Sequence, residues 1–263
     1  MHLTRIDLNS WIVQMAGQTV LIDPWLVDPL VFYGWPWLFT ASHITPPVFT
    51  PETLPPIDLI LISQGLDDHC HRPTLRALDH DLPVVGSPTA AKVVQRLGYP
   101  QVTPLLPWQT HRQGQLAMTA VPGAILQGQR ENGYMLQDLS TGTTLYYEPH
   151  LFDPTLGIEQ HFSQIEGAIA PVVGQIFPGL GTVIMGPEQA ITLVTTLKPK
   201  FFVPTSVGNI QTRGLLTTLI QSVGSVAEFR QRLIDSGATT QLLTPEPGET
   251  LDLRSWERKA MPH

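Results

Sequence analysis

The sequence is poor in cysteine and in charged residues, and each shortage excludes a class of protein. Its single cysteine, Cys70, rules out an intramolecular disulfide and is compatible with a reducing compartment. Charged residues make up 14% of the 263 residues, the formal net charge is −7, and no run of Lys or Arg occurs, so no nucleic-acid partner is expected. The 42% of hydrophobic residues can build a sizeable core.

Long apolar runs and targeting signals are also absent. The most apolar window, residues 25–49, is broken by Asp28 and by several prolines, so a membrane-spanning helix of about 20 apolar residues does not fit there. The first ten residues do not resemble a signal peptide, and a cytoplasmic location is therefore predicted. No repeat or Gly/Ser linker is found, which predicts one domain over residues 1–252 and a charged, frayed tail over residues 253–263.

Short apolar runs alternate with turn signals and predict a layered α/β structure. Helices are expected at residues 72–78, 89–97, 188–197 and 226–234. Strands are expected at residues 2–8, 11–15, 19–22, 58–62, 84–85, 102–103, 115–121, 133–139, 143–147, 165–170, 201–203 and 240–243. Strand-rich halves separated by helices favour β-sheet layers that are covered by helices.

The most informative motif is the polar loop that follows the apolar run Leu59–Ile62. A buried strand fixes the origin of the loop after it, and this loop carries Asp67, Asp68 and His69. Asp68 and His69 offer an oxygen and an imidazole nitrogen side by side, which suits Zn, Mn or Fe(II). In an alternative interpretation, at least one of the two aspartates caps the helix predicted directly after them.

Two neighbours of this motif are expected to have no direct chemical role. Cys70 has no cysteine partner and is interpreted as a half-buried structural thiol. A Cys–His nucleophile pair would need a depressed thiol pKa, which the sequence does not indicate. His71 is expected to be solvated rather than to bind a metal.

The order of these features resembles the metallo-β-lactamase fold. Residues Thr19–Leu26 read Thr-Val-Leu-Ile-Asp-Pro-Trp-Leu, and a strand that ends at Asp68-His69 follows, as in the stand-alone metal-dependent hydrolases of that superfamily. The resemblance covers residues 1 to about 250 and implies an αββα sandwich, in which two β-sheets pack face to face between helices. The metal site of that fold lies at one edge of the sandwich.

The metal-binding loop departs from the family pattern. The family motif His-x-His-x-Asp-His reads here from Gln64 to His69, so Asp68 and His69 are retained while Gln64 and Leu66 stand in place of histidines. The loop is more similar to that of a divergent clade, found in cyanobacteria and plants, that reads Ser-Gln-Gly-Leu-Asp-Asp-His. The same clade carries the segment Tyr-Tyr-Glu-Pro-His, which here ends at His150.

The later ligand positions of the family are altered as well. No histidine follows the strand that ends at Val121, and Thr205-Ser206 occupy the place of the last ligand histidine. By register, His150 takes the place of the bridging aspartate. The resemblance therefore implies at most one metal ion rather than a dinuclear centre.

The first hypothesis is a mononuclear metal hydrolase. Its predicted ligands are Asp68, His69, His150 and Glu148, and Asp23 would orient a ligand histidine. One divalent ion, Zn, Mn or Fe, would activate water to attack an ester, lactone, amide or phosphoester. Asp67 or Glu148 would act as general base. No nucleotide cofactor is expected, because no glycine motif has the spacing of a phosphate-binding loop.

The second hypothesis is a binding protein that has lost catalysis. In that case the former active-site cleft would hold a small organic ligand or a protein partner, because apolar groups at former ligand positions favour a dry pocket. The aromatic segment, residues 25–49, would be a lid or a docking surface for a protein or a membrane rather than a wrapping loop. The predicted pocket residues are Gln64, Leu66, Glu131, Asn132, Thr205 and Ser206.

Overall fold

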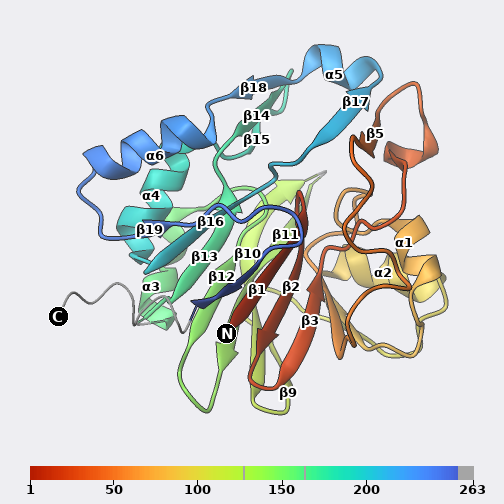
Figure 1. Ribbon diagram of the computed structural model, residues 1–263, viewed down its shortest axis with the longest axis horizontal. Coiled ribbons are helices and arrows are strands. Elements are labelled where there is room, and N and C mark those ends of the chain that lie inside the picture. The colour runs from red at the N-terminus through yellow and green to blue at the C-terminus, as the bar shows by residue number, and fades with distance from the viewer. Residues whose placement is uncertain (127, 163, 254–263) are drawn as a thin grey trace.

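Two β-sheets packed face to face form the centre of the molecule in the computed structural model, which describes residues 1–126, 128–162 and 164–253 (Figure 1). Across the first sheet, the strands are in order β20 (Thr250–Asp252), β1 (His2–Asp7), β2 (Ser10–Met15), β3 (Gln18–Ile22), β6 (Leu59–Ile62), β7 (Val84–Gly86) and β8 (Val102–Pro104). Across the second, they are β19 (Gln241–Leu242), β16 (Phe201–Thr205), β13 (Gly167–Pro171), β12 (Thr144–Tyr147), β11 (Gln129–Asp138), β10 (Leu116–Leu126) and β9 (Thr110–Gln113).

Helices cover the outer faces of both sheets, which gives four layers (Figure 1). The helices on the first sheet are α1 (Arg72–Ala77) and α2 (Pro88–Arg96). Those on the second sheet are α3 (Ile158–His161), α4 (Pro187–Leu197) and α6 (Val226–Asp235), with the short 3-10 turn η2 (Pro154–Leu156) beside them. The predicted αββα sandwich is therefore confirmed.

The continuous apolar runs of the sequence correspond to strands that are buried on both faces. In β6, Leu59 and Leu61 pack between the sheets, while Ile60 and Ile62 pack against the helices. In β16, Val203 likewise faces the other sheet. Because side chains alternate between the two faces of a strand, a strand between two apolar layers needs apolar residues at every position.

A third group of elements lies over one edge of the sandwich and is called the cap here. It comprises three segments, residues 30–43, 174–184 and 210–223. The cap elements are β4 (Leu30–Val31), η1 (Phe32–Gly34), β5 (Thr40–His43), β14 (Gly174–Phe177), β15 (Gly181–Ile184), β17 (Ile210–Arg213), α5 (Leu215–Leu219) and β18 (Gln221–Val223). They pair as two small sheets, β17-β5-β4 and β15-β14-β18. The sequence did not predict these strands, because they are short and β17 and β18 are mostly exposed.

The C-terminal prediction concerns residues 253–263, of which the structure describes Leu253 alone. Leu253 is buried, and its N–H donates to the carbonyl oxygen of Met1 at 3.1 Å, so it does not belong to a frayed tail. The other residues of the predicted tail lie outside the described residues. Among the helices of the described ranges, none has the length and apolar character needed to cross a membrane.

Candidate metal centre

The ends of several parallel strands meet at the edge of the sandwich beneath the cap. Strand β3 runs parallel to β6, and β12 runs parallel to β13 and β16. Parallel strands deliver the residues that follow them to the same edge of a sheet. The sites predicted after β3, β6, β12 and β16 are thereby brought together from positions far apart in the sequence.

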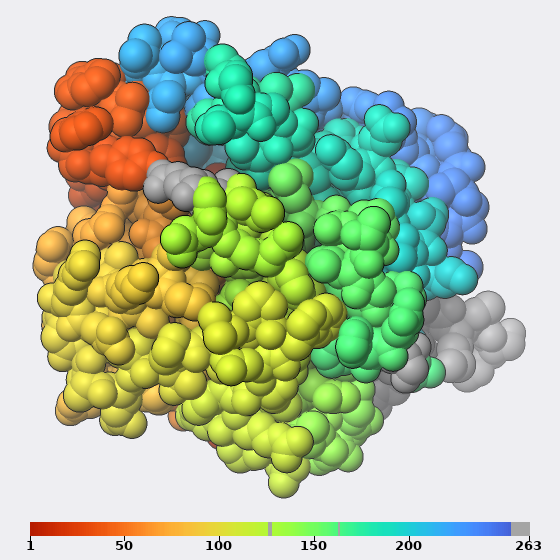
Figure 2. Space-filling view, turned by 180° about the vertical axis from the view of Figure 1, so that it is seen from behind, coloured from red at the N-terminus to blue at the C-terminus, as the bar shows by residue number. Residues whose placement is uncertain are grey.

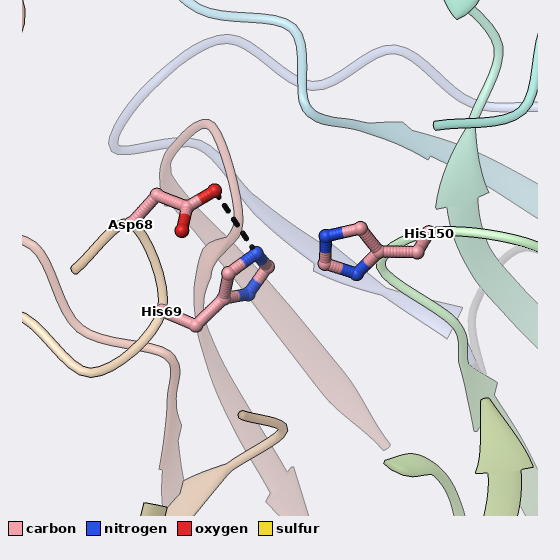
Figure 3. Close-up of side chains that lie close together, drawn as sticks. All are labelled: Asp68, His69 and His150. Atoms are coloured by element: carbon pink, nitrogen blue, oxygen red, sulfur yellow. Dashed lines mark ion pairs between the residues drawn. The ribbon is translucent and has the colours of Figure 1, made fainter. Parts of the chain in front are cut away.

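Asp68, His69 and His150 form a group of potential metal ligands at this edge. One ligand atom from each lies within 4.8 Å of the others. Asp68 Oδ2 is 3.3 Å from His69 Nε2, and the two imidazole rings are centred 4.8 Å apart. Figure 3 shows the three side chains turned toward one another, with His69 between Asp68 and His150. This donor set of one carboxylate and two imidazoles suits Zn, Mn or Fe(II).

His69 is held by a buried carboxylate, as a ligand histidine requires. Its Nδ1–H donates to Asp23 Oδ2 at 2.7 Å, which leaves Nε2 facing Asp68. Asp23 in turn accepts hydrogen bonds from the N–H and hydroxyl of Ser63, at 2.8 and 2.6 Å, and from the Tyr147 hydroxyl at 2.6 Å. The structure thus places Asp23 where the sequence hypothesis needed an orienting carboxylate.

Charge around His69 also fits a cation. Burial by itself lowers the pKa of His69, but the carboxylates of Asp68 and Asp23 outweigh burial and raise that pKa to about 10. The two carboxylates therefore favour positive charge at His69. A divalent ion would take over this positive charge once His69 releases its Nε2 proton.

His150 differs from its partner in being held by neutral groups. Burial and the charge of His69 lower the pKa of His150 to about 3, so the ring is neutral and has one lone pair, which a metal could take only in place of the Gln64 amide. The Gln64 amide donates to His150 Nε2 at 3.0 Å. Gln64 therefore occupies the position of the first motif histidine and contacts the substitute ligand.

Two buried oxygen atoms at the site lack a hydrogen-bond partner within the described part of the chain. They are Asp68 Oδ1 and Gln64 Oε1. Buried polar atoms are nearly always paired, so an unpaired pair of oxygens beside two imidazoles needs an explanation. A cation bound by Asp68 would satisfy its Oδ1, so this unpaired oxygen within the ligand group fits a metal ion.

Glu148 and Asp67 lie near the group but not within it. The Glu148 carboxylate accepts the N–H groups of His150 and Leu151 at 2.9 and 3.2 Å and the Tyr146 hydroxyl at 3.2 Å, and burial raises its pKa to about 7. Glu148 thereby fixes the loop that carries His150.

Asp67 pairs with Arg72 and accepts the N–H of Tyr33 at 2.8 Å. It thereby joins α1 to the aromatic segment. The helix-cap interpretation of the aspartates is wrong: His71 is the residue that caps α1, and no side chain bonds there.

Three other predicted pocket residues, Leu66, Thr205 and Ser206, form hydrogen bonds with residues near the ligand group. Thr205 is fully buried; it accepts the Trp11 indole N–H at 3.0 Å and donates to the Leu8 carbonyl at 2.7 Å. The Ser206 hydroxyl donates to Asn9 Oδ1 at 2.8 Å. Leu66 is half-buried, and its carbonyl accepts the N–H groups of His69 and Cys70 at the turn before α1.

Glu131 and Asn132 connect β11 to the same loops. The Glu131 carboxylate accepts the Thr89 hydroxyl at 2.7 Å, and that hydroxyl also accepts the N–H of Gly65 at 2.9 Å. The Asn132 amide donates to the Leu105 carbonyl at 2.9 Å. The Glu131 side chain is thus joined to the metal-binding loop through Thr89, and the Asn132 side chain contacts Leu105. Neither residue belongs to the ligand group.

Sequence reasoning missed Asn9, Ser63 and Tyr147. Asn9 Nδ2 lies 3.4 Å from His69 Nε2, and Asn9 Oδ1 accepts a hydrogen bond from the Ser206 hydroxyl. Asn9 therefore contacts one residue 60 positions away in the sequence and another 197 positions away. No local signal marks Asn9 or Tyr147. Ser63 could have been found, because it directly precedes the motif and follows a buried strand.

Backbone strain is concentrated at the same edge. Leu8, Asp23 and Ser206 all have positive φ, of 45°, 40° and 58°. Non-glycine residues in this region cost of order 1–3 kcal/mol each and persist only where surrounding contacts enforce them, which is common at functional sites.

Cys70 and His71 are both buried beside the site. Burial raises the pKa of the Cys70 thiol to about 12, which argues against a nucleophilic role and agrees with a structural one. The expectation that His71 is solvated is wrong. Its side chain packs edge-on against Trp25, Nδ1 bonds the Thr74 hydroxyl at 2.9 Å, and burial lowers its pKa to about 4.

A cavity of about 370 Å³ adjoins the centre and is lined by Asp68 and Asn9. The aromatic segment contributes Phe32 and Phe39 to its wall. Part of the aromatic segment therefore lines the cavity beside the ligand group, while Trp35 and Trp37 stack on each other and are exposed; its role as a lid or docking surface stays a prediction.

Comparison with known proteins agrees with the geometry. The UPF0173 metal-dependent hydrolase of Thermodesulfovibrio yellowstonii is 23% identical over 96% of this chain and 92% of its own length. The crystal structure of isothiocyanate hydrolase from Delia radicum gut bacteria superposes with a TM-score of 0.74 at 20% identity, over 95% of this chain and 98% of that one.

A possible metal-dependent hydrolase from Veillonella parvula gives a TM-score of 0.75 at 14% identity, again over 95% and 98% of the two chains. At these identities the structural likeness shows the fold. A family model, that of the beta-lactamase superfamily domain, matches residues 2–206, which is more than half of the sequence. With its two-sheet sandwich and its ligand group at the family's site edge, this chain belongs to the beta-lactamase superfamily and has the metallo-β-lactamase fold of the metal-dependent hydrolases.

Proposed function

We propose that this protein is a hydrolase that holds one divalent metal ion between Asp68, His69 and His150. The observation that carries the proposal is the approach of one donor atom from each of these residues to within 4.8 Å of the others, together with the buried, unpaired Asp68 Oδ1. A bound Zn, Mn or Fe ion supplies Lewis acidity and an activated water. The reaction class is hydrolysis of an ester, lactone, amide or phosphoester.

The residues of the chain prepare this centre. Asp23 fixes the tautomer of His69 and directs Nε2 toward Asp68. Gln64 and the loop held by Glu148 position His150. The general-base role of Asp67 or Glu148 stays a prediction, because the described contacts of both carboxylates are with neighbouring groups of the protein itself.

Elemental analysis of the purified protein tests the proposal. We expect about one equivalent of metal in the wild type and its loss in both Asp68→Ala and His150→Ala. His43→Ala is the matched control, because His43 is buried but lies outside the ligand group and bonds to Asp28. A metal-saturated wild type should gain about 2.7 kcal/mol of stability at a hundredfold excess over Kd. A wild-type protein that contains no metal after purification and does not bind added Zn, Mn or Fe would contradict the proposal.

Substrates would be screened once a metal is found. Neutral esters, lactones and amides come first, and isothiocyanates are included because one structural neighbour is an isothiocyanate hydrolase. Metal-dependent turnover that disappears in Asp68→Ala is the expected result.

A second candidate is a non-catalytic binding protein, and the cavity beside Asp68 favours it. This candidate predicts tight binding of a small ligand without turnover or bound metal. Docking of a protein partner or a membrane surface through the exposed Tyr33, Trp35 and Trp37 is proposed on their exposure alone. Substituting Trp35 and Trp37 by Ala without any change in partner binding would argue against such docking.

A further inference from the structure

The cavity beside Asp68 has an apolar wall supplied by all three segments of the cap. Figure 2 shows these red-orange, teal and blue segments meeting along the upper edge of the molecule when it is seen from behind. Large apolar side chains in the wall are half-buried. They are Phe32, Phe39, Phe177, Ile184, Ile210 and Ile220.

The charge of the lining is as informative as its apolar character. Asp68 is the one charged side chain among the described lining residues, and the polar ones are Asn, Gln, Ser and Thr. No Lys, Arg or His of the described chain faces the cavity to neutralise a phosphate or carboxylate. Since an anion buried without a cationic partner loses its hydration uncompensated, anionic groups are disfavoured at the cap end of the cavity, away from Asp68 and the ligand group.

The polar end of the cavity is continuous with the metal centre. Asn9 Nδ2 and Asp68 Oδ2 both line the cavity, and they lie 3.4 and 3.3 Å from His69 Nε2. A molecule that fills the cavity therefore has one end at the ligand group and the other among the cap side chains. The volume of about 370 Å³ is near the lower end for small-molecule sites, which argues for a compact molecule rather than a polymer.

We propose that this cavity binds a small substrate with an uncharged, apolar aliphatic or aromatic group, which lies between the cap segments. The hydrolysable bond would lie at Asp68. This inference rests on the proposed function for its reaction, and it narrows that function to substrates whose group at the cap end of the cavity is uncharged and apolar. Binding itself requires only the cavity.

Binding of a homologous amide series tests the proposal. Butanamide, hexanamide and octanamide are titrated into the full-length protein by calorimetry, beside the mono-amide of adipic acid, which has a carboxylate at the far end. Each added methylene should lower Kd about fourfold until the cavity is full. The carboxylate compound should bind at least about tenfold more weakly than hexanamide. A Kd independent of chain length would overturn the proposal.

Two variants localise the binding to the cap wall. Ile220→Asp should weaken hexanamide binding about tenfold or more, and Ile184→Asp, on another cap segment, provides an independent check. Ile234→Asp is the matched control, because Ile234 is 66% exposed on α6 and does not line the cavity. If Ile220→Asp and Ile184→Asp both bind as the wild type does while remaining folded by circular dichroism, the assignment is wrong.

The outcomes separate this inference from the proposed function. Chain-length-dependent binding by a protein that takes up no metal would retain the inference about the cavity and contradict the hydrolase. Metal-dependent hydrolysis of p-nitrophenyl acetate, with amide affinities that do not change with chain length, would retain the hydrolase and contradict the inference.

Discussion

The two halves of the metal centre hold their histidines in opposite ways. On the first sheet, His69 lies between the carboxylates of Asp23 and Asp68, which raise its pKa to about 10 despite burial. On the second sheet, His150 is held by the neutral amide of Gln64, and burial lowers its pKa to about 3. The first half depends on buried charge and the second on packing and loop geometry.

The difference teaches where a change in the sequence should matter most. Removing one member of a buried charged set leaves the others uncompensated, whereas removing one partner of a neutral hydrogen bond costs far less.

The largest effect is expected for Asp23→Ala. Loss of this carboxylate leaves His69 Nδ1 and the donors of Ser63 and Tyr147 without their buried acceptor, which should cost about 3–5 kcal/mol of stability. Metal affinity should fall about 10–100-fold. Urea denaturation and metal titration measure the two effects. An unchanged metal affinity in a folded variant would show that the His69 half does not depend on charge.

A smaller effect is expected for Tyr147→Phe. The Tyr147 hydroxyl donates to Asp23, and its loss should cost about 1–3 kcal/mol and weaken metal binding severalfold. Tyr99→Phe is the matched control, since the buried Tyr99 hydroxyl donates to the Leu75 carbonyl and to neither Asp23 nor a member of the ligand group. The control should lose stability and retain its metal affinity. If both variants bind metal equally well, Tyr147 has no role in positioning the site.

A third change addresses the neutral half. Gln64→Leu removes the hydrogen bond to His150 but preserves volume, so we expect a loss of about 1 kcal/mol and a smaller fall in metal affinity than for Asp23→Ala. Measuring both variants in one metal titration compares the halves directly. A larger loss of metal affinity in Gln64→Leu than in Asp23→Ala would contradict the proposed difference between the two halves.

The smallest effect concerns Glu131, whose carboxylate accepts the Thr89 hydroxyl and is not a member of the ligand group. Burial raises the pKa of Glu131 above 4.5, so the folded state holds its proton more tightly than the unfolded state. Its contribution to stability is fully present below pH 4.5 and is lost as pH rises through the folded-state pKa. Glu131→Gln should remove this decrease. If the free energy of unfolding, measured by urea denaturation, depends on pH in the same way in Glu131→Gln and in the wild type, Glu131 does not make this contribution.

Much of the sandwich was predictable because its signals are local. The fully apolar strands β6 and β16 and the Pro-initiated helices α1 and α2 identify themselves by residue type alone. The cap strands could not be predicted in this way. They are short, β17 and β18 are mostly exposed, and some of their pairing partners lie far away in the sequence, as with β5 and β17.

The sequence by itself determined that Asp68 and His69 stand together after a buried strand and that most family histidines are replaced. Only the tertiary structure decided that His150 faces them while Glu148 turns to backbone N–H groups. It also brought Asn9 to His69 and Ser206 and assembled the cavity wall from three distant segments. The physical reason is that strand and helix signals arise from neighbouring residues, whereas the direction of a loop side chain is set by long-range packing.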